Sequence, residues 1–393
     1  MDILNELAEK LQSYLRNHSK YQFSLKYQNK HLSKTGDIML KPIDQEVNAE
    51  FSFEPNSLIT EGRKWNITIN ECKINNGSVS LFLNRVPVYR NIIGQIIENK
   101  LAPAWKHEQI CITCDVEESD HFSMTNFRML SVYNIVRNII KFNGYDITNN
   151  PNIDGIVEKI IVGKSSSLKA VGVTHITCAP VITNGISAND YIRKRANDMQ
   201  LIAQHKYGIR VKDQQRFQVT VASLGRSAAI VDMLESKANS QIDLKKEKNK
   251  SSKGAAFILY NYARLSVLFK TFDQKQHTNY YPPLPAVVDI DFSLLTEEDE
   301  WQLFWVYVAG FPAMMQHASG NGQLVKIAPH IVLSFASGLV ISLSKYYRRI
   351  RILTENRNHL LPVMFARIYL LKSVYIVLST LMALLDLEPI AEM

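Results

Sequence analysis

The sequence predicts a mixed fold class, α/β plus all-α, arranged as a small α+β domain, a central α/β domain and a C-terminal helical bundle. Three observations support this: apolar–polar alternation in the first hundred residues, a strand–helix–strand order after residue 104, and helical periodicity beyond residue 254. The chain has 393 residues, enough for two or three domains, and its 46% hydrophobic content suffices to build their cores. Wholesale disorder is therefore excluded.

The N-terminal domain is expected to span residues 1–103. Apolar residues at helical spacing predict an amphipathic helix over 1–20, whereas the polar residues 21–60 are expected to be irregular. Alternation on either side of the Asn75-Asn76-Gly77 turn predicts a hairpin of two half-buried strands. Residues 87–99 follow with the apolar spacing of a helix, which completes a small α+β domain.

The central domain is expected to span residues 104–244. Residues 110–116 have the pattern of a strand, and residues 126–143 have that of a helix. Short β-like runs follow between 147 and 185, and Phe217 to Ser223 is expected to form a further strand. This order is typical of a βαβ unit with a parallel sheet.

A basic linker, residues 245–253, is expected to lead into a helical bundle over residues 254–393. Helical periodicity predicts four helices, which are residues 255–272, a segment that begins at Thr296 and ends at Pro312, residues 327–347 and residues 362–387. Thr296 is a natural N-cap, and Asp299 three residues later nearly completes a capping box. The continuous apolar stripe of the last helix predicts that it lies in the core of the bundle.

The net charge of +8 is unevenly distributed. Residues 1–158 carry 17 basic and 19 acidic side chains, residues 159–250 carry 16 and 7, and residues 253–393 carry 12 and 11. The stretch from Lys345 to Lys372 contains seven basic residues and one acidic residue, Glu355. Basic zones of this kind favour a nucleic-acid partner that is bound in a salt-sensitive way. A solvated helix face together with a lysine-rich linker is the alternative interpretation.

The composition excludes several classes of protein. No uncharged apolar run reaches the about 18 residues of a membrane span, so no membrane partner is expected. The polar, acidic start is unlike a secretory signal, and four cysteines do not make a disulfide scaffold, so a cytoplasmic location is expected. Cys111 and Cys114 lack further ligands at metal-site spacing, which favours structural thiols over a metal or redox role. No complete phosphate-binding loop occurs, so neither a metal nor a cofactor is expected.

Four motifs in the C-terminal region follow one another in a recognisable order. They are Tyr260-Asn261-Tyr262-Ala263-Arg264, the stretch from Leu295 to Leu303, Phe311-Pro312, and the stretch from Ala366 to Val374 with the terminal residues 384–393. Together they resemble the DALR anticodon-binding domain, which is the C-terminal bundle of arginyl-tRNA synthetases. The resemblance covers residues 253–393.

Upstream, the resemblance to the synthetases is weaker and the departures are informative. Residues 77–99 resemble a strand and helix of the synthetase N-terminal domain, and residues 126–155 resemble the stretch after the class I signature. The ATP-binding His-Ile-Gly-His sequence then falls on Ser123-Met124-Thr125-Asn126, so both histidines and the glycine are missing. No Lys-Met-Ser-Lys-Ser-like loop follows; Ser223 to Ser227 is only a trace of its surroundings. The resemblance therefore implies a reduced Rossmann-like central domain without adenylation chemistry.

The chain is similar to the family of DALR anticodon-binding domain-containing proteins, which are catalytically degenerate relatives of arginyl-tRNA synthetase. The resemblance implies a non-enzymatic adaptor that binds arginine tRNA and assists a tRNA methyltransferase in forming 3-methylcytidine in the anticodon loop. No DNA partner is expected. Two alternatives stay open: a residual arginyl-tRNA ligase and a scaffold that binds only protein.

Ten residues of the bundle are candidates for RNA contact, because aromatic rings stack on bases while nearby cations contact phosphates. For those of the first helix, core packing and helix capping are the alternative roles, and for the cluster around Arg348 it is a solvated helix end. Arg85 and Arg90 of the N-terminal domain are expected near the tRNA elbow. The ten residues are Tyr260, Tyr262, Arg264, Tyr346, Tyr347, Arg348, Arg349, Arg351, Arg367 and Lys372.

Overall fold

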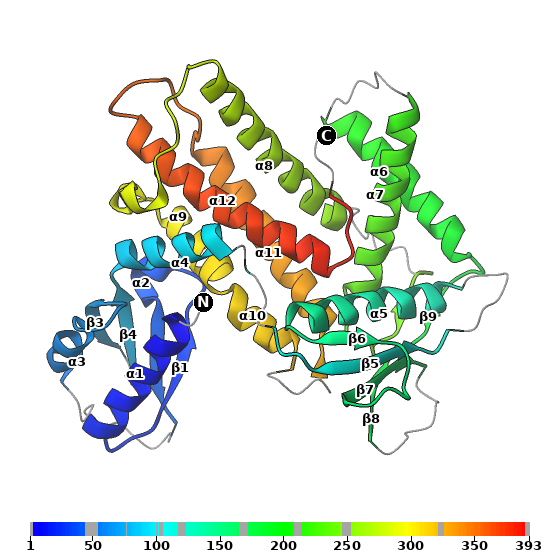
Figure 1. Ribbon diagram of the computed structural model, residues 1–393, viewed down its shortest axis with the longest axis horizontal. Coiled ribbons are helices and arrows are strands. Elements are labelled where there is room, and N and C mark those ends of the chain that lie inside the picture. Colours follow the sequence, from blue (N-terminus) through cyan, green and yellow to red (C-terminus); the bar gives the residue numbers. More distant parts are fainter. Residues whose placement is uncertain are drawn as a thin grey trace. The chain divides into compact units, whose positions relative to one another are not determined.

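The computed structural model (Figure 1) describes residues 3–43, 54–75, 77–99, 101, 105–116, 123–164, 172–207, 214–245, 253–320 and 326–389. The chain divides into two compact units, and each is described by itself. Unit 1 comprises Met1–Lys100, Lys275–Pro312 and Lys345–Val374, and unit 2 comprises Leu101–Gln274, Ala313–Ser344 and Tyr375–Met393. Most of the predicted linker (246–252) and the last residues (390–393) lie outside the described residues. The predicted domain limits stay predictions.

The first part of unit 1 is an antiparallel sheet with the strand order β1-β2-β4-β3. Its elements are α1 (Ile3–His18), β1 (Phe23–Tyr27), α2 (Leu32–Thr35), β2 (Ile38–Pro42), α3 (Pro55–Gly62), β3 (Ile69–Asn75), β4 (Ser78–Leu83) and α4 (Arg85–Asn99). Asn75 pairs with Ser78 across the hairpin turn. The predicted first helix, the hairpin and the helix after it are confirmed.

The expectation that residues 21–60 are irregular is wrong. In the described part of this stretch lie the strands β1 and β2 and the short helix α2, and α3 begins at Pro55; Ile38 and Leu40 of β2 are fully buried. β1 alternates between half-buried and exposed side chains, with the exposed Lys26 between Leu25 and Tyr27. Strands this short contain only two or three inward residues each, so the polar outward residues dominated the pattern.

Unit 1 also contains a segment that follows the first helix of the bundle. Its elements are η1 (Val287–Asp289), η2 (Phe292–Leu294), α9 (Glu298–Leu303) and the π-helical η3 (Phe304–Ala309). The capping box of α9 is formed by Glu297 and Glu300. The predicted pair, Thr296 and Asp299, lies one residue too early in the sequence. Pro312 lies in the first turn of α10 (Phe311–Ala318), where a proline costs no helical hydrogen bond.

Unit 2 contains the predicted parallel sheet, with strands in the order β6-β5-β7-β8. The strands are β5 (Gln109–Cys114), β6 (Asp146–Thr148), β7 (Ile156–Gly163) and β8 (Val173–Thr177), and α5 (Met124–Phe142) connects β5 to β6. Two further strands, β9 (Val181–Ile182) and β10 (Ile242–Asp243), form a parallel pair. In the sequence, β9 comes before α6 (Ala188–Tyr207) and α7 (Gln214–Leu234), and β10 comes after them. The prediction of a strand at 217–223 is wrong, because these residues belong to α7.

Three long helices of the predicted bundle are confirmed: α8 (Lys253–His277), α11 (Pro329–Arg349) and α12 (Leu361–Leu384). Each contributes residues to both units. Among the described residues, α12 is the one helix that is long and apolar enough to cross a membrane by length and composition. Of its most apolar 18-residue window, 67% is buried, as in the core helix of a bundle.

Candidate nucleic-acid interface

The ten predicted RNA-contacting residues fall into two groups in the structure. Tyr260, Tyr262 and Arg264 lie on the part of α8 that belongs to unit 2. The other seven lie in unit 1, on the last turn of α11, the connection that follows it, and the first half of α12. The two groups are therefore considered separately.

On α8, Tyr262 is engaged in packing within unit 2. Its ring stacks on that of Tyr375 with the centroids 4.9 Å apart, and the two hydroxyls are hydrogen-bonded at 2.8 Å. Burial raises the pKa of Tyr375 to about 12. Tyr260 is half-buried, with the guanidinium of Arg264 5.8 Å from its ring centroid. Both tyrosines are half-buried, so each of them takes part in packing while keeping some exposed surface.

In unit 1, Tyr346 and Arg367 are tied to the fully buried carboxylate of Glu300. The hydroxyl of Tyr346 donates to Glu300 at 3.0 Å, and Nε of Arg367 donates to the same oxygen at 2.8 Å. Tyr346 has no exposed surface, and its ring and hydroxyl belong to the core. Arg367 is 15% exposed and neutralises the buried carboxylate.

Asp299, the neighbour of Glu300, holds two further cations of the predicted cluster. Lys345 pairs with its Oδ1 at 2.8 Å and Arg349 with its Oδ2 at 2.5 Å. Both cations retain 59% exposure of the side chain, so they can also face an external anion. The carboxylate reduces the net positive charge that they present together.

The remaining predicted residues of unit 1 lie nearer to solvent. Arg348 and Arg351 are exposed, and Tyr347 is half-buried. Lys372 lies 5.8 Å from the ring centroid of Tyr369. The basic zone thus keeps an exposed part around Arg348 and Arg351, where α11 ends.

Arg85, predicted to lie near the tRNA elbow, contacts two residues of α9 within unit 1. It pairs with Glu298 at 3.1 Å, and its guanidinium lies 5.0 Å from the ring centroid of Trp301. The indole nitrogen of Trp301 donates to the buried Asp37 at 2.7 Å, so α9 is fixed to the N-terminal sheet. Arg90 is exposed on α4 and is the better candidate for an external contact.

Two residues that the sequence reasoning missed lie at the end of α8. Tyr280 is 43% exposed, and Nζ of Lys275 lies 4.9 Å from its ring centroid. An exposed aromatic ring beside a cation is the combination that single-stranded RNA favours. The signal that could have found them is the Tyr280-Tyr281 pair directly after a helix whose last turn is basic.

The start of α5 contains the four residues that resemble the position of the synthetase nucleotide motif, Ser123 to Asn126. Ser123 caps the helix by accepting from the backbone N–H of Asn126 at 3.1 Å, and the Met124 side chain is buried. The hydroxyl of Thr125 accepts from the N–H of Val181 at 3.1 Å. The positions that resemble the synthetase histidines are therefore engaged in a helix cap and in the core.

All four cysteines are free thiols. Burial raises the pKa of Cys114 to about 12 and the pKa values of Cys72 and Cys178 to about 11. Cys111 is buried. In the part of the chain that the structure describes, no group of three or more His, Cys, Asp or Glu side chains could hold a metal ion. His121, which flanks the Cys111–Cys114 pair in sequence, lies outside that part.

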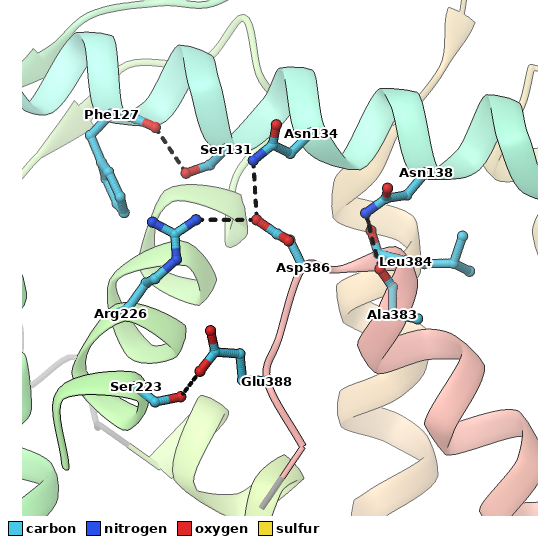
Figure 2. Close-up of polar contacts among 10 residues, drawn as sticks. All are labelled: Phe127, Ser131, Asn134, Asn138, Ser223, Arg226, Ala383, Leu384, Asp386 and Glu388. Carbon is cyan, nitrogen blue, oxygen red and sulfur yellow. Dashed lines mark hydrogen bonds and ion pairs between the residues drawn. The ribbon is translucent and has the colours of Figure 1, made fainter. Parts of the chain in front are cut away.

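Figure 2 shows how the C-terminal end of α12 is held in unit 2. Asn138 of α5 donates to the carbonyl oxygens of Ala383 and Leu384 at 3.0 and 3.3 Å, which satisfies acceptors that a helix end leaves open. Asp386 follows in the left-handed conformation (φ 56°), a position at which helices most often have glycine.

The side chains after α12 are also engaged. The Asp386 carboxylate accepts from Asn134 at 3.1 Å and pairs with Arg226 at 3.3 Å (Figure 2). The hydroxyl of Ser223 on α7 donates to Glu388. Ser223 to Ser227, which resemble the surroundings of a synthetase loop, are helical residues of α7. Two of them, Ser223 and Arg226, contact the residues that follow α12.

The fold as a whole is similar to that of arginyl-tRNA synthetases. The enzyme of Thermus thermophilus matches with a TM-score of 0.68 at 10% identity, over 99% of this chain and 100% of that chain. The enzyme of Plasmodium falciparum matches with a TM-score of 0.64 at 11% identity, over 98% and 99%. Residues 258–393 match the DALR anticodon binding domain. The fold is therefore of the arginyl-tRNA synthetase type, and residues 258–393 are similar to the DALR anticodon binding domain.

Two curated proteins are similar to this chain in sequence. The chain is 31% identical over 228 residues to the DALR anticodon-binding domain-containing protein 3 of Rattus norvegicus, and 28% identical over 231 residues to that of Danio rerio. The matches cover 55% and 56% of this chain but only 42% and 41% of the relatives. The resemblance predicted from the sequence motifs is confirmed.

Proposed function

We propose that this protein is a non-catalytic adaptor that binds arginine tRNA and assists a tRNA methyltransferase in forming 3-methylcytidine in the anticodon loop. The observation that carries the proposal is a combination. Residues 258–393 match the DALR anticodon binding domain, the fold is similar to that of a synthetase, and Ser123 to Asn126 stand where the resemblance places the nucleotide motif. A protein of this kind retains the shape that receives a tRNA and lacks the groups that activate an amino acid. A cytoplasmic location, with neither DNA nor a membrane as partner, is part of the proposal.

The start of α5 supports the absence of adenylation chemistry. Catalysis of phosphoryl or adenylyl transfer needs preorganised donors aimed at the developing charge. Ser123 and Thr125 instead accept hydrogen bonds from Asn126 and Val181, and Met124 is buried. We infer that ATP finds no histidine donor there.

The exposed part of the basic zone supports RNA binding. Arg348 and Arg351 project where α11 ends, and Tyr260 on α8 supplies a half-buried ring beside Arg264. For contacts of this type, the logarithm of the affinity falls linearly with the logarithm of the salt concentration. The slope is proportional to the number of phosphates that are neutralised.

The RNA-binding part is tested by charge reversal in a gel shift with arginine tRNA. Because Arg349 pairs with Asp299, the informative variant is R348E/R351E, and R193E on α6 (75% side-chain exposure) is the matched control. The double variant is expected to lower the slope of log affinity against log salt by about 0.7–0.9 per lost contact. Unchanged retention would favour the protein-only scaffold.

The catalytic alternative is tested by ATP–pyrophosphate exchange with arginine. The proposal expects no arginine-dependent exchange, with or without tRNA, and clear exchange would establish a ligase instead. The methylation role is tested by depleting the protein from cells and measuring 3-methylcytidine in arginine tRNAs, with serine tRNAs as the internal comparison. An unchanged level in the arginine tRNAs contradicts the adaptor role.

A further inference from the structure

The end of α8 forms an ordered turn with its own hydrogen bonds. The N–H groups of Tyr280 and Tyr281 both donate to the carbonyl oxygen of Lys275, at 2.8 and 3.0 Å. Asn279 adopts the left-handed conformation (φ 54°) that commonly ends a helix. This geometry fixes the direction in which the two tyrosines leave the helix.

Tyr281 anchors the turn to the connection between α11 and α12. It is 2% exposed, and its hydroxyl donates to the carbonyl oxygen of Thr354 at 2.5 Å. A second tyrosine, Tyr369 of α12, donates to the carbonyl oxygen of Pro285 at 2.7 Å. The segment after α8 is therefore held at two points within unit 1.

Tyr280 differs from its neighbour because it faces solvent. Its exposed fraction is 43%, and its ring meets that of Tyr281 edge-on with the centroids 4.9 Å apart. Nζ of Lys275 lies 4.9 Å from the Tyr280 centroid and 5.2 Å from the Tyr281 centroid. The exposed ring is thus fixed by a buried one and has a cation beside it.

The two cations at this place, Lys275 and Arg351, have no carboxylate partner within the described ranges of the chain. Arg351 is exposed, donates through Nε to the carbonyl of Leu353, and acts electrostatically on Tyr281. The other cations of the zone differ: Lys345 and Arg349 pair with Asp299. Positive charge at the Tyr280 end is therefore not neutralised internally.

We propose that Tyr280, Lys275 and Arg351 form a binding site for one unpaired RNA nucleotide. The base stacks on the exposed part of the Tyr280 ring, and Lys275 and Arg351 contact its flanking phosphates. The nucleotide is unpaired because a base inside a duplex does not offer its face to a side chain. The site adds a contact to the RNA-binding surface and rests on the proposed tRNA-binding function.

The test compares full-length variants in binding to arginine tRNA and to a fluorescein-labelled ten-nucleotide oligouridine. Y280A is expected to weaken oligouridine binding about 5- to 150-fold, the loss that one stacked base implies, without changing the salt slope. Y280F keeps the ring and is expected to bind like the wild type. K275A is expected to lower the salt slope by about 0.7. W105A removes an exposed ring in unit 2 (58% exposed) and is the matched control.

The outcomes separate this site from the proposed function. If arginine tRNA binds but Y280A and K275A bind both RNAs like the wild type, the site is refuted and the tRNA-binding proposal stands. If oligouridine binding is lost in Y280A while arginine tRNA is not preferred over other tRNAs, the site stands and the proposed function fails. If the wild type retains neither RNA, both are refuted. An equal loss in W105A and Y280A also refutes the site, because it would show a general effect of removing a surface ring.

Discussion

Replacing Glu300 by alanine is expected to destabilise unit 1 by at least about 4 kcal/mol, because this buried carboxylate has three partners. It accepts from Arg367, from the hydroxyl of Tyr346 and from the backbone N–H of Glu297. Glu300 itself is 0% exposed, and Arg367 is 15% exposed. The change therefore leaves a cation, a hydroxyl and a helix end without an acceptor.

The magnitude follows from the separate losses. Removing one partner of a buried ion pair costs about 3–5 kcal/mol, because the other charge stays desolvated. An unsatisfied buried hydroxyl such as that of Tyr346 adds about 1–3 kcal/mol, and a lost cap at Glu297 about 0.5–2 kcal/mol. These losses are not additive, so the expected total of at least about 4 kcal/mol is set slightly below the sum of the three lower limits. E300Q keeps an acceptor but leaves the charge of Arg367 uncompensated, so it is expected to cost about 3 kcal/mol, less than E300A.

The assay is urea unfolding followed by tryptophan fluorescence, which reports on this place because Trp301 and Trp305 lie on α9 and η3. E298A is the matched control two residues away. Glu298 is 39% exposed and pairs with Arg85, so its loss is expected to cost at most about 1 kcal/mol.

The double variant E300A/R367M removes both charges. Its cost is expected to be about 2 kcal/mol less than the sum of the two single variants, since no uncompensated charge remains. Strictly additive costs, or a loss below about 3 kcal/mol for E300A, would refute the reasoning that this pair is buried and coupled.

Three further predictions concern unit 2. D386A is expected to lower the thermal midpoint more than D386G, because both lose the contacts to Arg226 and Asn134 but alanine also keeps the left-handed strain of about 1 kcal/mol; equal midpoints in differential scanning calorimetry would contradict this. The thiol of Cys114, with a pKa of about 12, is expected to react with iodoacetamide at about pH 8 at least about a hundredfold more slowly than free cysteine, as measured by mass spectrometry. The raised pKa of Tyr375 means that the stability its neutral hydroxyl provides is present below about pH 10 and lost as the pH rises to about 12; Y375F is expected to lessen the fall in unfolding free energy over that range. A wild-type curve that is flat there would argue against burial of this hydroxyl.

The elements with a strong period could be predicted from the sequence. α8, α11 and α12 lie within a few residues of their expected limits, because many turns of a helix repeat the same apolar spacing. The short strands β1 and β2 could not be predicted, since two or three inward residues do not distinguish alternation from chance. Residues 217–223 alternate like a strand and contain β-branched residues, yet they lie inside α7, where tertiary context overrides local preference.

The candidate site was predictable in outline only. The sequence located the basic zone and the loss of the nucleotide motif, and the zone's end at Arg348 and Arg351 is exposed. It did not show that Tyr346 is buried, because the burial depends on Glu300, 46 residues earlier in the chain. It also did not identify Tyr280 as a candidate. The exposure of this tyrosine depends on how the turn after α8 packs, and Tyr281 holds that turn against Thr354.

By itself, the sequence determined the order of α+β, α/β and helical regions, the DALR resemblance and the absence of the synthetase histidines. These are properties of local pattern and residue identity, which a linear chain carries in full. Only the tertiary structure decided which cations are neutralised by carboxylates and which face outward. The physical reason is that charge pairing and burial are set by neighbours in space: Glu300 and Arg367 are 67 residues apart in sequence and 2.8 Å apart in the fold.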